Sequence, residues 1–123
     1  MKILLTGATG YIAKRLIPVL LDAGNEVVCC VRDKHRFNSD KYKSEKLSII
    51  EVNFLEKESL KEIPNDIDAA YYLIHSMSTT KGKFEEMEKI SALNFKERIE
   101  KTQAKQVIYL SGIVNEEALS KHL

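Results

Sequence analysis

The chain has 123 residues, of which 44% are hydrophobic, so it is long enough for about one domain with its own core. Its 19 basic and 18 acidic side chains leave a net charge of +1, which gives no electrostatic reason to expect a nucleic acid or an anionic membrane as partner. No apolar run approaches the roughly 20 residues of a membrane span, and the short apolar run after Lys2 does not make a signal peptide.

The first two predicted elements are a buried strand and a helix joined by a glycine turn. Lys2–Leu5 is short and apolar, which is typical of a buried parallel strand. Apolar residues at helical spacing then predict an amphipathic helix over residues 10–23, which Gly24 and Asn25 can end with a left-handed cap. The turn between them reads Thr-Gly-Ala-Thr-Gly-Tyr-Ile-Ala over residues 6–13.

This turn has the context of a phosphate-binding loop. Gly7 can adopt backbone angles closed to other residues, and Gly10 lets a pyrophosphate approach the backbone without meeting a Cβ atom. The amides of the first helical turn and the helix dipole add to the attraction for an anion. The alternative is a tight turn that binds nothing. We predict that the loop contacts a dinucleotide through Gly7, Thr9, Gly10, Tyr11 and Ile12.

A second strand is predicted at Glu26–Val31, and the residues after it bear on the choice of dinucleotide. An NAD-preferring domain usually has a carboxylate here that binds the ribose 2′-hydroxyl. This chain has Arg32, whose guanidinium can pair with the 2′-phosphate of NADP. The sequence therefore favours NADP over NAD. NAD would be preferred if the neighbouring Asp33 faced the ribose instead.

The second strand also holds both cysteines of the chain. Cys29 and Cys30 are adjacent, so in a strand their side chains point to opposite faces of the sheet. That spacing predicts neither a disulfide nor a metal site, and a reducing cytoplasmic setting is expected.

The remaining chain continues the alternation of strands and helices. Residues 33–46 are polar and lysine-rich without a clear element, and residues 112–123 hold no finished element. The alternation predicts an α/β Rossmann-type fold, a doubly wound parallel sheet of about five strands in the order 3-2-1-4-5. The further predicted elements are strands at 47–53, 69–75 and 106–111 and helices at 56–63 and 83–103.

Ligands of such sheets lie beyond the carboxyl ends of the strands, where several polar residues fall. Asn53 is at the end of the third strand and Phe54 comes directly after it, and both are expected to hold the adenine. His75 is at the end of the fourth strand, with Ser76 after it, near the expected nicotinamide ribose, and Ser111 is at the end of the fifth. A structural role is as reasonable for Ser111 and more so for His75, so no residue is assigned as catalytic.

Taken together, these motifs resemble the amino-terminal portion of an atypical or extended short-chain dehydrogenase/reductase of the NmrA-like, NAD(P)H-binding group. Asn94, in the long helix, is part of that match and is expected to bind main chain near the fourth strand. The resemblance implies a cytoplasmic NAD(P)-dependent reductase, a sugar-nucleotide epimerase-like enzyme, or a redox sensor that binds the dinucleotide without turnover. The other matching segments are residues 6–13, 24–28 with Arg32, 53–55, 68–77 and 107–111.

One departure from the family concerns catalysis. The family pairs a Ser or Thr after the fifth strand with a Tyr-x-x-x-Lys on the following helix, and no such pair follows Ser111. We expect residues 1–123 to be an incomplete dinucleotide-binding domain, truncated before the substrate-binding half. The fifth strand would then be an open edge, through which the chain could self-associate. A Tyr-x-x-x-Lys in a continuation of the chain would favour the enzyme, and its absence the sensor.

Overall fold

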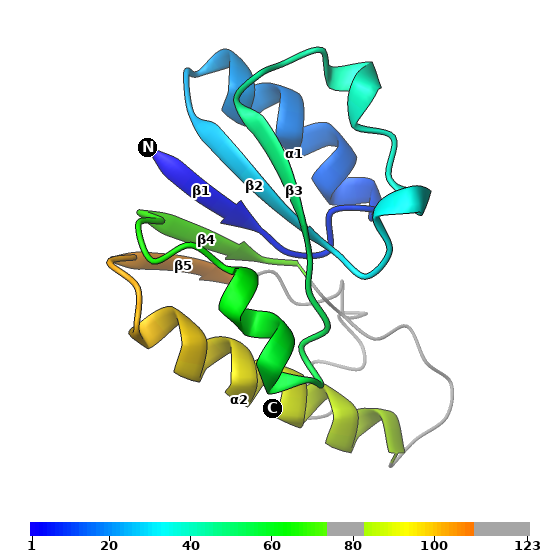
Figure 1. Cartoon of the computed structure of the whole chain (residues 1–123), viewed down its shortest axis with the longest axis vertical. Coiled ribbons are helices and arrows are strands. Elements are labelled where there is room, and N and C mark those ends of the chain that lie inside the picture. Colours follow the sequence, from blue (N-terminus) through cyan, green and yellow to red (C-terminus); the bar gives the residue numbers. More distant parts are fainter. Residues whose placement is uncertain (74–82, 110–123) are drawn as a thin grey trace, which may run out of the picture.

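The computed structural model describes residues 1–73 and 83–109. Their centre is a parallel sheet of five strands in the order β3-β2-β1-β4-β5 (Figure 1). This is the doubly wound, Rossmann-type order, so the predicted fold class is confirmed. The strands are β1 (Lys2–Leu5), β2 (Glu26–Val31), β3 (Leu47–Glu51), β4 (Ala69–Tyr72) and β5 (Gln106–Tyr109).

Two helices, α1 (Tyr11–Asp22) and α2 (Lys83–Glu100), lie on opposite sides of the sheet (Figure 1). Alternation along β1 sends Ile3 and Leu5 into the core on the α1 side and Leu4 into the core on the α2 side. The central strands are therefore apolar on both faces, as buried parallel strands require.

The two cysteines follow the same alternation, as predicted. Cys29 belongs to the core on the α1 side and Cys30 to the core on the α2 side, and both are buried free thiols. Burial raises the pKa of both thiols, that of Cys29 to about 12. Neither side chain is therefore a thiolate at neutral pH, and both act as packing residues.

The short helix predicted at 56–63 is a 3₁₀ helix, η3 (Lys57–Glu62), and the polar segment after β2 holds two more, η1 (Lys34–Arg36) and η2 (Ser39–Tyr42). At η3 the reason is visible in the hydrogen bonds. Residue 64 is a proline, so the Leu60 carbonyl has no amide one α-helical turn further along the chain from which to accept. It accepts instead from the N–H of Ile63 at 3.1 Å, the 3₁₀ pattern, and from the side chain of Arg98 on α2, which also donates to the carbonyl of Ile63. The connection from β3 to β4 thus has no α-helix.

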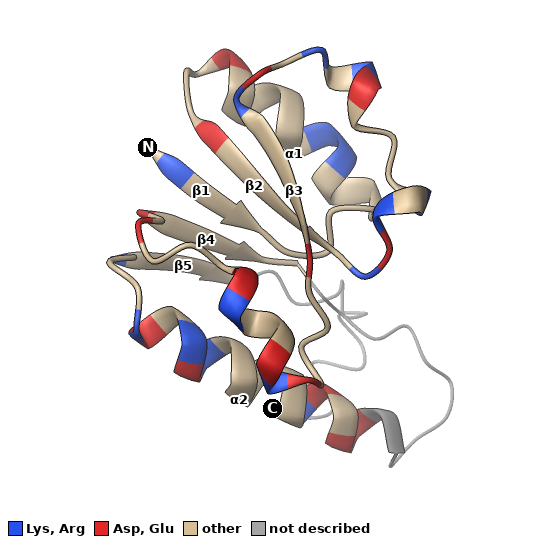
Figure 2. Cartoon of the chain, viewed as in Figure 1, with Lys and Arg blue, Asp and Glu red and all other residues tan. Residues whose placement is uncertain are grey.

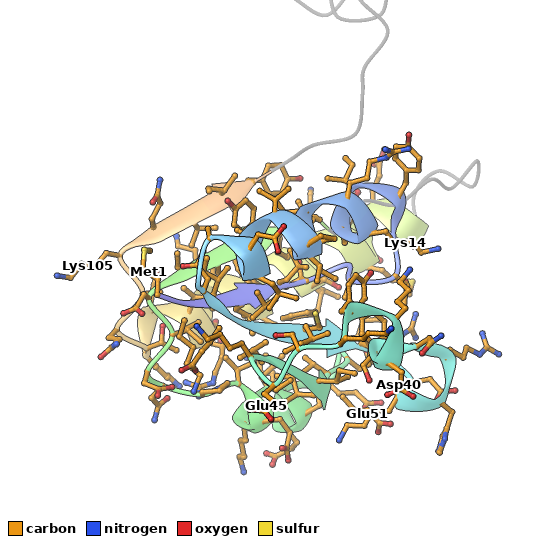
Figure 3. All side chains as sticks on the ribbon, turned by 90° about the horizontal axis from the view of Figure 1, so that it is seen from above. Met1, Lys14, Asp40, Glu45, Glu51 and Lys105 are labelled. Carbon is orange, nitrogen blue, oxygen red and sulfur yellow. The ribbon has the colours of Figure 1, made fainter. Side chains whose placement is uncertain are left out.

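Charged residues lie mainly on helices and loops rather than on the strands, and both signs are mixed along α2 (Figure 2). Figure 3 shows Lys14 and Lys105 projecting away from the body of the sheet. Within residues 1–73 and 83–109, no helix combines the length and apolar character that a membrane crossing requires.

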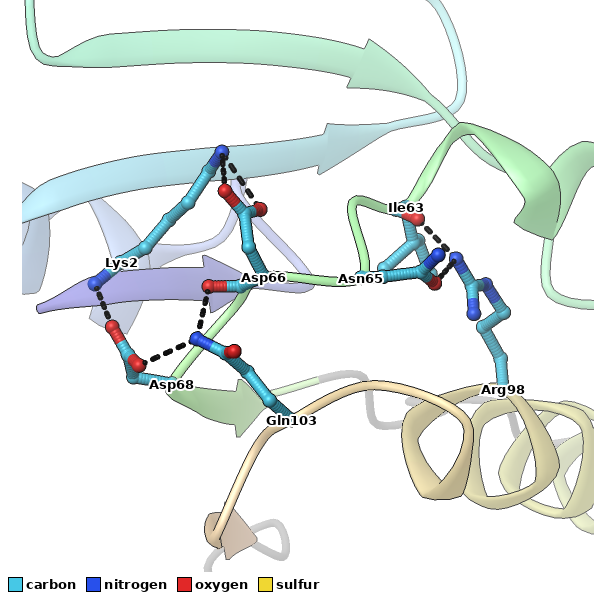
Figure 4. Close-up of polar contacts among 7 residues, drawn as sticks. All are labelled: Lys2, Ile63, Asn65, Asp66, Asp68, Arg98 and Gln103. Atoms are coloured by element: carbon cyan, nitrogen blue, oxygen red, sulfur yellow. Dashed lines mark hydrogen bonds and ion pairs between the residues drawn. The ribbon is translucent and has the colours of Figure 1, made fainter.

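A polar network joins the amino ends of β1 and β4 to the end of α2 (Figure 4). Asp68 accepts from the backbone N–H of Lys2 at 2.8 Å and from the side chain of Gln103 at 3.0 Å. The Lys2 ammonium pairs with Asp66 at 3.0 Å. The backbone hydrogen bond from Lys2 holds the pKa of Asp68 below its usual value of 3.8.

We expect Asp68→Asn to lower the free energy of unfolding at neutral pH and to lose this effect in acid. The folded-state pKa is depressed, so the ionised carboxylate stabilises the fold above the unfolded pKa of about 4, and that stabilisation disappears as the pH falls through the folded pKa. Urea unfolding of both proteins at several pH values measures the difference. Asp40→Asn is the control, because the Asp40 side chain makes no hydrogen bond or ion pair with another described residue. A difference between the Asp68 variant and the parent that stays the same down to pH 2 would contradict this account.

Candidate functional site

A cleft of about 680 Å³ opens beyond the carboxyl ends of β1 to β4. The topology of the sheet predicts a ligand at this edge. Four segments that follow or end strands line the cleft, together with one face of α2. They are residues 7–10 after β1, residues 30–33 at the end of β2 with Arg36, residues 52–55 after β3, and Leu73 after β4; α2 contributes Met87, Glu88 and Ser91.

Both glycines of the loop after β1 lie where a Cβ atom would make a close contact. Gly7 has the positive φ that the turn predicts, +67°, and a Cβ atom there would lie 3.1 Å from the carbonyl carbon of Leu73. The N–H of Gly10 donates to the carbonyl oxygen of Gly7 at 3.0 Å. A Cβ atom on Gly10 would lie 3.2 Å from that same oxygen. The backbone of this loop is therefore close to the cleft with no side chain at either position.

The amino end of α1 presents free amides beside this loop. The first hydrogen bond of the helix runs from Lys14 N to Gly10 O at 3.1 Å, so the N–H groups of Tyr11, Ile12 and Ala13 have no partner among the described residues. No side chain caps the helix, and its first turn has no acidic residue. Amides and helix dipole together make a place for an anion such as a phosphate.

The side chains of Tyr11 and Ile12 do not line the cleft. They are 70% and 42% exposed, and the Tyr11 ring lies under the guanidinium of Arg15, 4.4 Å from its centroid. Any contact of these two predicted residues with a ligand in the cleft would therefore involve their backbone amides.

At the end of β2, the acidic side chain of Asp33 and the basic side chain of Arg32 differ in whether they have partners. The Asp33 carboxylate accepts from the N–H of His35 at 2.9 Å and pairs with Arg36 at 3.7 Å, which directs it to its own loop. Arg32 is exposed, lines the cleft, and makes no hydrogen bond or ion pair with another described residue.

After β3 the predicted pair Asn53 and Phe54 lies on the cleft wall. The Asn53 side-chain oxygen accepts from the N–H of Leu55 at 3.0 Å, which closes a turn and leaves the side-chain NH₂ without a described partner. The Phe54 ring packs edge-on against Tyr72 and Phe95 in the core.

The prediction for Asn94 is wrong in one respect. Its side chain does bind main chain, but the partner is the carbonyl of Phe54 after β3, at 2.6 Å, rather than a group near β4. The reason is that α2 packs against the connection from β3 to β4, which includes η3.

Comparison with known proteins now settles the family. The model of a protein family described as NAD(P)H-binding matches residues 7–122. The chain belongs to this NAD(P)H-binding family. No curated protein matches the chain.

Solved structures share the fold of this NAD(P)H-binding chain. Gre2 of Candida albicans in complex with NADPH superposes with a TM-score of 0.74 at 17% identity, covering 89% of this chain and 36% of that one. UDP-N-acetylglucosamine 4-epimerase of Bacillus cereus gives 0.71 at 19% identity, with shares of 89% and 36%. A nucleoside-diphosphate-sugar epimerase of Staphylococcus aureus gives 0.68 at 19% identity, with shares of 89% and 37%. The chain thus spans a little over a third of the length of these proteins.

Thr6 supports the cleft from the protein interior without lining it, and no sequence pattern predicted this role. It is fully buried, and its hydroxyl donates to the carbonyl of Tyr71 and accepts from the N–H of Leu73, both at 3.1 Å. It thereby joins the ends of β1 and β4 and sets the distance between Gly7 and Leu73. Only its position directly before the first glycine could have suggested this.

Three predicted residues of the site, His75, Ser76 and Ser111, lie outside the described residues. Among residues 1–73 and 83–109, no group of three or more His, Cys, Asp or Glu side chains is arranged to hold a metal ion.

Proposed function

We propose that this chain is the cofactor-binding part of a short-chain dehydrogenase/reductase-like or sugar-nucleotide epimerase-like oxidoreductase, and that it prefers NADP to NAD. Membership of the NAD(P)H-binding family supports the binding of a dinucleotide, and the structural similarity to Gre2 with NADPH and to two epimerases supports the proposed class of enzyme. In such enzymes the bound nicotinamide exchanges a hydride with a carbon of the substrate, and the protein supplies position and electrostatics.

The observation that carries the NADP preference is the arrangement of Asp33 and Arg32. A carboxylate that selects NAD must be free to accept from the ribose 2′-hydroxyl. Both residues line the cleft, but Asp33 accepts from His35 N–H and pairs with Arg36, whereas Arg32 pairs with no described residue. A guanidinium in that position can form paired, charge-assisted hydrogen bonds with a 2′-phosphate.

In this proposal, different residues of the cleft bind different parts of the dinucleotide. The backbone of Gly7, Gly10, Tyr11 and Ile12, with Thr9 beside it, would hold the pyrophosphate, and Arg32 the 2′-phosphate. Asn53 and Phe54 would hold the adenine. His75, Ser76 and Ser111 remain proposed contacts of the nicotinamide half, because they follow strands that end at this edge.

We expect Arg32→Ala to weaken the binding of NADPH by roughly 10- to 100-fold, as for the loss of a charge-assisted hydrogen bond, and to change NADH binding by less than about twofold. Isothermal titration of each variant with both dinucleotides measures this. Lys34→Ala is the matched control, since it removes the same charge from the same loop but from a residue that does not line the cleft. Equal losses for NADPH and NADH, or equal effects of the two variants, would contradict the role of Arg32.

We also propose that residues 1–123 form one incomplete dinucleotide-binding domain. The family match over residues 7–122 supports a single dinucleotide-binding domain over residues 1–123, and the share of the solved structures that the chain spans supports a substrate-binding half outside it. Self-association through β5 is supported by the position of this strand at the edge of the described sheet, where Val107 and Tyr109 are exposed.

A cytoplasmic location is proposed from the two reduced cysteines. The non-catalytic redox sensor would use the same cleft and has no separate support.

A further inference from the structure

The wall of the cleft after β3 is held from behind by α2. Asn94 and Arg98 are one helical turn apart on that helix and both face the connection from β3 to β4. Arg98 donates to the carbonyl of Leu60 at 2.9 Å. It also donates to the carbonyl of Ile63 and, at 2.7 Å, to the side chain of Asn65 (Figure 4). This anchors the far end of the connection.

The near end of the connection is the turn at residues 53–55, and two successive peptide groups of this turn are fixed. In the peptide between Asn53 and Phe54, the carbonyl oxygen accepts from Glu56 N and is bound by the Ser59 hydroxyl, both at 2.8 Å. In the next peptide, the Phe54 carbonyl accepts from Asn94 at 2.6 Å. The N–H of that second peptide, from Leu55, is bound by the Asn53 side chain.

One N–H of this turn remains without a partner. The amides of Asn53, Leu55 and Glu56 are all hydrogen bonded, but that of Phe54 has no partner among the described residues. In a trans peptide the N–H points away from the carbonyl oxygen. The Phe54 N–H is therefore aimed away from the Ser59 hydroxyl that binds the carbonyl oxygen of the same peptide, and Phe54 lines the cleft. A donor fixed in this way costs little ordering entropy when it binds a ligand.

We propose that Ser59 and Asn94 are positioning residues for adenine recognition: they fix the two peptide groups around Phe54 so that its N–H donates to N1 of the adenine. The inference rests on the proposed function, because it concerns one end of the same dinucleotide. Asn94 is 4% exposed and does not line the cleft, and Ser59 does not line it either, so both act through the turn.

The test compares NADP⁺ with nicotinamide hypoxanthine dinucleotide phosphate. Adenine N1 has a lone pair that can accept the Phe54 N–H, whereas hypoxanthine has a hydrogen on N1 and cannot. We expect the chain to bind NADP⁺ about tenfold more tightly than the hypoxanthine analogue, as for one well-placed hydrogen bond. Ser59→Ala and Asn94→Ala should reduce this ratio to about two or less, mainly by weakening NADP⁺ binding. Ser59→Thr keeps the hydroxyl and should keep the ratio.

The ratio distinguishes positioning from general support of the fold. A purely structural role would weaken both dinucleotides equally and leave the ratio at its parent value, and that result in a folded Ser59→Ala or Asn94→Ala protein would overturn the proposal. So would tight binding of both dinucleotides by the parent chain without discrimination, a result that leaves the proposed function intact. If the folded parent binds neither dinucleotide, the proposed function fails together with this inference.

Discussion

Gly7→Ala is expected to lower the free energy of unfolding by about 2–5 kcal/mol and to abolish measurable dinucleotide binding. An L-residue at the φ of +67° found at Gly7 costs about 1–2 kcal/mol. The new Cβ atom would also lie 3.1 Å from the backbone carbon of Leu73, and forcing an added methyl group into close packing costs about 1–3 kcal/mol more. Relief of this contact requires β1 and the segment after β4 to move apart. The glycine loop would then no longer present its amides at the cleft.

Gly24→Ala separates the two causes. Gly24 also has a positive φ, +88°, but an added Cβ atom there meets no atom within 4 Å. This control should lose only the conformational term of about 1–2 kcal/mol and should bind NADPH as the parent does. Chemical denaturation and isothermal titration of the three proteins give both quantities. If the two variants lost the same free energy of unfolding and both still bound NADPH, the close approach of Gly7 to Leu73 would not be needed for binding.

Thr6→Val is expected to destabilise the fold by about 1–3 kcal/mol, although it changes the shape of the side chain very little. The hydroxyl is fully buried and both donates to Tyr71 O and accepts from Leu73 N. Its removal leaves a buried carbonyl with one hydrogen bond fewer and takes the hydroxyl acceptor from a buried amide, and such losses have costs of this size. Because these bonds join β1 to β4 directly before the glycine loop, NADPH affinity should fall as well, by about tenfold or more.

Thr6→Ser is the matched control, because it retains the hydroxyl and loses only a methyl group. It should keep most of the affinity for NADPH even where its stability falls. Thermal unfolding and NADPH titration of the two variants provide the comparison. A serine variant that loses as much affinity as the valine variant would show that packing of the methyl group, rather than the hydroxyl, sets the position of the loop.

The sheet could be predicted because its signals are local. Short apolar runs, the glycine turn after β1 and the helical spacing of α1 each depend on neighbouring residues, and right-handed crossovers then restrict the strand order. The positive φ of Gly7 follows from the same turn. Positions at the carboxyl ends of strands identify one edge of the sheet, which is where the cleft lies.

Contacts between distant segments gave no such signal. Thr6 bonds residues 65 and 67 positions away, and no pattern around it indicates these partners. The binding of Asn94 to main chain was predicted, but its partner depends on how α2 packs against the β3 to β4 connection. The contacts of Arg98 with the carbonyls of Leu60 and Ile63 depend on the same packing. The orientation of Asp33 depends on the short η1 helix that its own side chain caps.

The central claim is that a dinucleotide binds in the cleft with its phosphates at the glycine loop. Two-dimensional ¹⁵N–¹H NMR during a titration of the chain with NADPH tests this residue by residue. We predict large shifts for the amides of Gly7, Gly10, Tyr11, Ile12 and Phe54, together with the Arg32 side chain, and small shifts for Lys57, Lys61 and Lys101, none of which lines the cleft. Shifts centred on those lysines, or none at the glycine loop at saturating NADPH, would contradict the account.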